Sequence, residues 1–172
     1  MTYFTALKVR SFAQLWAGQT ISRIGDYLYQ VALAWWVLER TGSATVMGAV
    51  LICAMAPMLV FVLLGGILVD RLPRARLMLM SDLARGVISI SITLLAATQR
   101  LEVWHVYVAS VLFGLVDAFF QPAYTALVPE IVPPEALPSA NAVTSVSAQM
   151  GRIVGPLLGA TIIATGGTAV AF

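Results

Sequence analysis

Residues 151–160, GRIVGPLLGA, lie inside a long apolar stretch near the end of the sequence. They contain Arg152, Pro156 and three glycines spaced four residues apart, and none of these residue types is favoured inside an isolated helix surrounded by lipid. The glycines are Gly151, Gly155 and Gly159. Glycines at this spacing share one face of a helix and allow a neighbouring helix to approach closely. The stretch therefore predicts a membrane helix that packs tightly against another helix and that Pro156 tends to kink.

The composition of the whole chain supports a membrane environment. Of the 172 residues, 60% are hydrophobic and 10% are charged, and the mean hydropathy is +0.91. Soluble domains have about 25% charged residues, so this chain has too little polar surface to cover a soluble globule. The net charge of +2 predicts no nucleic-acid partner, because the few basic residues follow membrane topology. A single cysteine, Cys53, provides no disulfide or metal framework.

Five apolar stretches are long enough to cross the hydrocarbon core, which takes about 20 residues in a helix. They are residues 12–38, 44–69, 77–98, 103–125 and 139–165. Helices are expected because unpaired backbone groups are not tolerated in lipid, and polar or proline-rich segments separate the five stretches. The fold class predicted is an all-α membrane protein, a polytopic bundle of about five transmembrane helices.

Lysine and arginine residues between the spans predict the orientation in the membrane, since cytoplasmic loops carry an excess of them. If five helices alternate in direction, one side carries Lys8, Arg10, Arg71, Arg74 and Arg76. The opposite side carries Arg40 and Arg100. The expected protein is therefore a multi-pass protein of the plasma (inner) membrane with a cytoplasmic amino terminus.

Polar and small residues recur at helical spacing on three of the predicted helices. The first helix carries Gln19, Arg23, Asp26 and Gln30. The fourth carries Ser110, Gly114, Asp117 and Gln121, and the fifth carries Asn141, Ser145, Ala148, Arg152, Gly155 and Gly159. Three helices with one polar or small face each predict a bundle around a shared polar interior.

Two interpretations of these stripes remain open. Arg23 and Asp26 are three residues apart, close enough to pair within the first helix. The charged groups either connect helices, as an Asp117–Arg152 pair would, or line a wet cavity that carries substrate or protons. Interhelical hydrogen bonds contribute only about 0.6 kcal/mol on average, whereas a charge at the bilayer centre costs about 2.5–3.5 kcal/mol, which favours the cavity. The candidate substrate and proton pathway residues are Gln19, Arg23, Asp26, Gln30, Asp117, Gln121 and Arg152. Asp26 is the candidate titrating carboxylate.

Two motifs resemble those of the major facilitator superfamily. The pattern of Gly151, Gly155, Pro156 and Gly159 resembles the fifth-helix antiporter motif of its drug:proton antiporters, with Ala160 where a glycine is usual. Residues 66–76, GILVDRLPRAR, resemble the superfamily signature between the second and third helices, with Pro73 in place of a common glycine. The signature positions are Gly66, Asp70, Arg71, Arg74 and Arg76, which the resemblance implies form a cytoplasmic gating loop.

Further stretches extend the resemblance over essentially all 172 residues. LWAGQTISRIGDYLYQVAL, AFFQPAYTALVPEIVPPEAL and ANAVTS are similar to segments of the branch that includes macrolide efflux proteins and the enterobactin exporter. One departure concerns the fourth helix, where many drug antiporters carry an arginine and this sequence has Asp117.

The resemblance implies a transporter of twelve helices in two halves, with a substrate site between the halves near the midplane. The chain then corresponds to five of the six helices of the amino-terminal half, and its sixth helix and the carboxy-terminal half are expected as missing partners. The implied function is proton-coupled efflux of an amphipathic small molecule, such as a drug, a macrolide or a siderophore, by alternating access through the lipid bilayer.

Other function classes receive less support from the sequence. The alternatives kept open are a membrane scaffold or accessory subunit that transports nothing, and an inactive fragment. An enzyme is not expected, because there is no glycine-rich phosphate loop and no nucleophile–histidine pair. No cofactor and no metal site is predicted.

Overall fold

The computed structural model describes residues 4–69 and 72–166, and describes side chains at 4–61 and 72–166. Within those residues the chain forms five long helices and no strand. The helices are α1 (Arg10–Thr41), α2 (Ala44–Val69), α3 (Arg74–Ala97), α4 (Val103–Ile131) and α5 (Leu137–Gly166). Two short 3-10 helices precede α1 and α5, namely η1 (Thr5–Lys8) and η2 (Pro134–Ala136). The predicted all-α polytopic bundle is confirmed.

The helices extend beyond most of the predicted spans. α1 continues to Thr41 and ends where Gly42 adopts the left-handed conformation, with a φ of 63° that favours glycine. The joint between the fourth and fifth spans, predicted from its prolines, is shorter than expected, because α4 runs to Ile131 and α5 begins at Leu137. Pro138 falls in the first turn of α5, where the missing N–H has no helical partner to lose.

Four helices are long and apolar enough to cross a membrane over the residues that the structure describes: α2, α3, α4 and α5 with its preceding turn. α1 is 32 residues long and is not among them. Polar residues in its middle, including Gln19, Arg23 and Asp26, lower its mean hydropathy. α1 therefore differs from the other four helices in the polar and charged residues near its middle, and not in its length.

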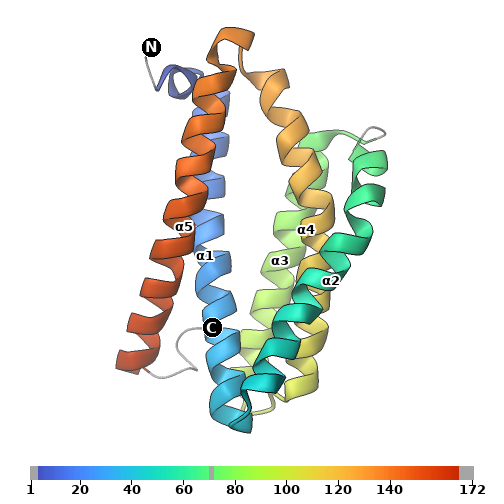
Figure 1. Cartoon of the computed structure of the whole chain (residues 1–172), viewed down its shortest axis with the longest axis vertical. Coiled ribbons are helices and arrows are strands. Elements are labelled where there is room, and N and C mark those ends of the chain that lie inside the picture. The colour runs from blue at the N-terminus through green and yellow to red at the C-terminus, as the bar shows by residue number, and fades with distance from the viewer. Residues whose placement is uncertain (1–3, 70–71, 167–172) are drawn as a thin grey trace.

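The helices pack as two groups that lie side by side (Figure 1). α1 packs along α5 in one group, and α2 and α3 both pack against α4 in the other. α1 and α2 join the groups at the end opposite the amino terminus. Two of these pairs, α1 with α5 and α2 with α4, join helices that are not consecutive in the sequence. Side chains of α1, α3 and α4 meet between the groups.

Buried apolar side chains form two clusters, one toward each end of α1, α3 and α4. The first contains Phe12 of α1, Leu77 of α3 and Phe120 of α4. The second contains Leu33 of α1, Ile92 of α3 and Phe113 of α4. The residues that lie between these clusters along the same three helices include the charged groups described below.

One helix pair is in very close contact. A Cβ atom added at Gly114 of α4 would collide with the backbone carbonyl of Ala54 on α2. Small residues allow this approach, which provides packing where lipid supplies no hydrophobic driving force. Large apolar side chains such as Leu59, Val87 and Ile153 are instead exposed on the outer faces of the bundle, as expected of surfaces that contact lipid.

Candidate functional site

Arg85 lies at the centre of a charged cluster between three helices. Its side chain comes from the middle of α3 and is 7% exposed. One terminal nitrogen, Nη2, donates to Oδ1 of Asp117 on α4. The other, Nη1, donates to Oδ2 of Asp26 on α1 at 3.4 Å. The guanidinium lies over the ring of Phe120, with 4.4 Å from Cζ to the ring centroid.

A second carboxylate on α3 faces the same arginine. Oδ1 of Asp82 lies 3.6 Å from Nη1 of Arg85, three residues further along the helix. Oδ2 of Asp82 accepts a hydrogen bond of 3.0 Å from Nε2 of Gln19 on α1. Gln19 is itself buried. Three carboxylates therefore surround one guanidinium, and one of them is tied to α1 by an amide.

The local sequence explains why these groups converge. Gln19 and Asp26 are seven residues apart, two helical turns, so both lie on the face of α1 that meets α3. Asp82 and Arg85 are three residues apart and share a face of α3. A charge in the hydrocarbon layer costs several kcal/mol when unpaired, and removal of one partner from a buried pair costs about 3–5 kcal/mol. The convergence of the charges offsets these penalties.

A small polar pocket opens onto this cluster. It has a volume of about 80 Å³, enough for more than one water molecule, since a site needs about 10–15 Å³ to hold one. Its lining comes from α1, α3 and α4, and consists of Arg23, Asp26, Tyr27, Gln30, Arg85, Asp117, Phe120 and Gln121. The ion pairs thus border space that water can enter.

A larger and mostly apolar pocket adjoins the polar one. Its volume is about 260 Å³, and apolar side chains such as Leu51, Met55 and Met58 of α2 form much of its wall. Gln30 and Asp117 line both pockets. Asp117 therefore lies where a charged pocket adjoins a mostly apolar one.

The stripe predicted on α1 is brought into this region. Gln19 contacts Asp82, Asp26 contacts Arg85, and Gln30 lines both pockets. The predicted partner of Asp26 differs, because its ion pair among the described residues is with Arg85 and not with Arg23. The Arg23 guanidinium lies over the ring of Tyr124 on α4, 5.3 Å from the centroid, while its side chain still lines the polar pocket.

The predicted pair of Asp117 and Arg152 does not form within the described part of the chain. Asp117 pairs with Arg85, and Nε of Arg152 donates to the hydroxyl of Tyr27 at 3.1 Å. The reason is the packing of α5, which lies along α1 and hardly meets α4. Arg152 is exposed and does not line the polar pocket, but its partner Tyr27 does.

The stripes predicted from the sequence omit Arg85 and Asp82. The sequence does contain an indication of them, because Asp82 and Arg85 are two charges three residues apart inside an apolar 24-residue helix. Placing these charges in the hydrocarbon layer costs as much free energy as placing Asp26 there. Ser81, Arg85 and Ser89 also repeat every four residues. An arginine does reach the fourth helix, but it comes from α3, because the guanidinium of Arg85 donates to Asp117 of α4.

The fifth-helix motif is a packing surface against α1. Gly151, Gly155 and Gly159 are all buried there. A Cβ added at Gly155 would lie 2.5 Å from the Cβ of Tyr27, whereas one at Gly151 would make an ordinary 3.4 Å contact with the Tyr27 ring. Pro156 lies within the continuous helix α5. The exposed Asn141 and Ser145 of the predicted stripe do not share this buried surface.

The structure describes only part of the predicted gating loop. Asp70 and Arg71 lie outside the described residues, and Gly66 lies in the stretch of α2 whose side chains are not described. Arg74, at the start of α3, pairs with Glu130 near the end of α4 and donates to the carbonyl of Ala126 at 3.4 Å. This pair fastens α3 to α4 at that end of the bundle.

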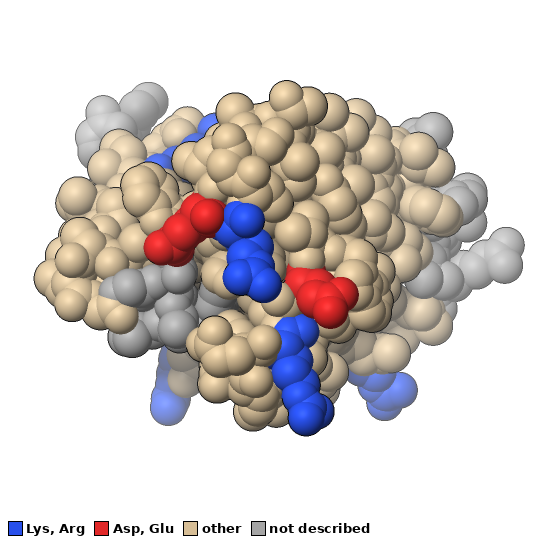
Figure 2. Space-filling model, turned by 90° about the horizontal axis from the view of Figure 1, so that it is seen from below, with Lys and Arg blue, Asp and Glu red and all other residues tan. Residues whose placement is uncertain are grey.

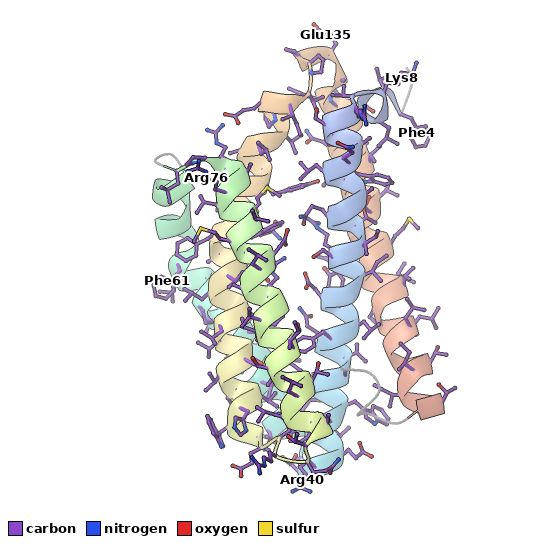
Figure 3. The ribbon with its side chains drawn as sticks, turned by 180° about the vertical axis from the view of Figure 1, so that it is seen from behind. Phe4, Lys8, Arg40, Phe61, Arg76 and Glu135 are labelled. Atoms are coloured by element: carbon purple, nitrogen blue, oxygen red, sulfur yellow. The ribbon has the colours of Figure 1, made fainter. Side chains whose placement is uncertain are left out.

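Basic residues are distributed unequally over the two ends. Lys8 and Arg76 lie at the same end, together with Glu135, and Arg40 lies at the opposite end (Figure 3). Figure 2 views the bundle from below, where mostly uncharged atoms surround a few intermixed acidic and basic side chains. Arg40 and Glu39 belong to the last turns of α1, and the connection between α3 and α4 carries Arg100 and Glu102.

Metal binding finds no support in the described residues, which contain no group of three or more histidine, cysteine, aspartate or glutamate side chains placed to hold an ion. The cluster around Arg85 already places a cation between its carboxylates.

Comparison with known proteins places these features in a family. Residues 1–172 match the model of a family described as transmembrane secretion effector. Macrolide efflux protein A of Streptococcus pyogenes is 31% identical, and the match covers 88% of this chain and 37% of that protein. Multidrug efflux pump Tap of Mycolicibacterium fortuitum is 35% identical, and the match covers 90% of this chain and 38% of that protein. Enterobactin exporter EntS of Citrobacter koseri is 29% identical, and the match covers 92% of this chain and 38% of that protein. The chain thus spans little more than a third of the length of these relatives. No solved structure matches it.

Proposed function

Because this chain belongs to the transmembrane secretion effector family of the major facilitator superfamily, we propose that it provides helices of an efflux transporter that exchanges an amphipathic small molecule for protons by alternating access. The observation that carries the proposal is the convergence of Asp26 and Asp117 on Arg85 in a pocket that water can enter.

The ion pairs suit a proton-coupled step. Protonation of a carboxylate that accepts from a guanidinium removes its charge and weakens the ion pair. Since Asp26 and Asp117 come from different helices and share one arginine, protonation of either loosens α3 from α1 or from α4. Such a change alters how the two helix groups hold together, which alternating access requires.

The apolar pocket supports an amphipathic substrate. An apolar portion of the substrate would contact the wall that Leu51, Met55 and Met58 form, and a polar portion would reach Gln30 and Asp117. Methionine side chains adapt to different shapes, which suits a transporter that accepts several compounds. The efflux functions named for the relatives fit this class of ligand.

The five helices would form most of the amino-terminal half of a twelve-helix transporter, and a carboxy-terminal half would complete the substrate site. The unequal distribution of basic residues supports an orientation in which the end of Lys8 and Arg76 is cytoplasmic. The proposed location is the plasma membrane.

The proposal is tested with the complete gene product in proteoliposomes, by measuring substrate movement driven by an imposed pH gradient. Asp26→Asn and Asp117→Asn are expected to lower gradient-driven transport at least tenfold. Glu135→Gln is the matched control, because Glu135 is exposed in η2 at one end of the bundle (Figure 3), and it is expected to transport normally. Undiminished pH-driven transport by both aspartate variants would contradict the role of these carboxylates, and wild-type transport that does not respond to the pH gradient would contradict proton coupling. No transport by the complete wild-type protein would favour a scaffold.

A further inference from the structure

We propose that Asp82 is a positioning residue that keeps Arg85 in the polar pocket and balances its charge whenever Asp26 binds a proton. This inference rests on the proton-coupled transport proposed above. Asp82 belongs to α3 and does not itself line the pocket. The inference explains why a third carboxylate lies beside Arg85.

The geometry places one donor between two acceptors. Nη1 of Arg85 donates to Oδ2 of Asp26 at 3.4 Å, and it also lies 3.6 Å from Oδ1 of Asp82, which is an ion-pair contact without a hydrogen bond. Nη2 is committed to Asp117. When Asp26 is neutral, the guanidinium still has Asp82 on one side and Asp117 on the other. An arginine whose side chain is 7% exposed therefore keeps a counter-charge, and a buried charge without one would be strongly destabilising.

Gln19 keeps Asp82 in place for this role. Its amide donates to Oδ2 of Asp82, and it is buried, so the second oxygen of the carboxylate, Oδ1, remains on the side of Arg85. α1 packs mainly on α5, and α3 packs on α4. The polar links between α1 and α3 that the structure records are Gln19–Asp82 and Asp26–Arg85, and they lie between the two apolar clusters.

The other charged and titratable groups near Asp26 do not replace Asp82. Arg23 of α1 is turned toward the ring of Tyr124 on α4. Tyr27 of α1 accepts from Arg152 of α5. Asp117 of α4 is already bound to Nη2. Among these groups only Asp82 shares the nitrogen that Asp26 uses.

The expected effect of Asp82→Asn has a definite sign. The substitution removes a negative charge near Asp26, and it leaves Nη1 of Arg85 to Asp26 alone. Both changes favour the ionised form of Asp26 and make proton binding there harder. The midpoint of the transport rate against pH is therefore expected to move about one unit toward lower pH, since a charge within about 4–6 Å has an effect of that order or larger.

The experiment measures that midpoint in the complete transporter for wild type, Asp82→Asn, Asp82→Glu and Asp26→Asn. Asp82→Glu retains the charge and is expected to restore most of the wild-type midpoint, which a purely structural role would not predict. Glu135→Gln is the control for a charge removed far from the cluster. Protein recovery and thermal unfolding in detergent establish that each variant is folded, and Asp82→Ser replaces Asp82→Asn if the latter is not recovered.

The outcomes separate this inference from the proposed function. A flat pH profile for Asp26→Asn together with a wild-type midpoint for Asp82→Asn overturns the role of Asp82 and leaves proton coupling intact. A wild-type profile for Asp26→Asn overturns the role of Asp26 as the proton-binding carboxylate and with it the role of Asp82. A midpoint shifted toward lower pH in Asp82→Asn, and restored in Asp82→Glu, supports the positioning role.

Discussion

Arg85 of α3 and Asp117 of α4 form an ion pair in the middle of the bundle, and the same guanidinium also reaches Asp26 of α1. One side chain thus connects three helices at a depth where the rest of each helix is largely apolar. Its removal affects both the stability of the bundle and the charge state of its neighbours.

We expect Arg85→Gln to destabilise the protein by about 3–5 kcal/mol, because it leaves Asp26, Asp82 and Asp117 without their shared counter-charge. Arg85→Lys is expected to recover part of this loss, since an ammonium retains the charge but does not reach two carboxylates in the geometry of a guanidinium. Unfolding in detergent, followed by circular dichroism against temperature or denaturant, measures the difference. Equal stability of Arg85→Gln and wild type would show that the pairs are not formed in the membrane protein.

The glycines of α5 allow a test of its packing on α1. Gly155→Ala would place a methyl group 2.5 Å from the Cβ of Tyr27 and 2.9 Å from the carbonyl oxygen of Ile24, so the helices must separate. A loss of about 1–3 kcal/mol is expected for such overpacking. Gly151→Ala is the matched control from the same helix, because its new methyl makes only a normal contact. A loss as large at Gly151 as at Gly155 would contradict the described register of the two helices.

The contact between α2 and α4 is tested independently by Gly114→Ala. The added Cβ meets the backbone carbonyl of Ala54, which cannot rotate away as a side chain can. We therefore expect a stability loss of at least about 2 kcal/mol, toward the upper part of the range for overpacking. Gly86→Ala in α3 is the control, since nothing lies within 4 Å of its new methyl group. The readout is the thermal unfolding midpoint of both variants in the same detergent.

The orientation in the membrane is tested by labelling. In a Cys53→Ser background, single cysteines replace Arg40 or Arg76, which lie at opposite ends of the bundle (Figure 3). A membrane-impermeant maleimide added to intact cells is expected to label the cysteine at position 40 and to label the one at 76 only after permeabilisation. The reverse pattern would place the amino terminus outside.

The sequence alone determined the helices and their approximate limits, because apolar length and helical spacing are local properties. It also identified Asp26 and Asp117 as residues whose charge requires an explanation, and it located the glycine surface of α5, which the structure places against α1. Spacing along one helix showed which residues share a face. It did not show which other helix that face meets.

The tertiary structure alone decided the pairing of the charges. Arg23 is three residues from Asp26 in the sequence, yet Asp26 is bound by Arg85, 59 residues away, because α1 turns that face toward α3. Arg152 lies on α5, which packs along α1, so it reaches Tyr27 and not Asp117. An ion pair between helices depends on which helices are neighbours and on how each helix is rotated about its axis. Both follow from how the apolar and glycine surfaces of all the helices pack together.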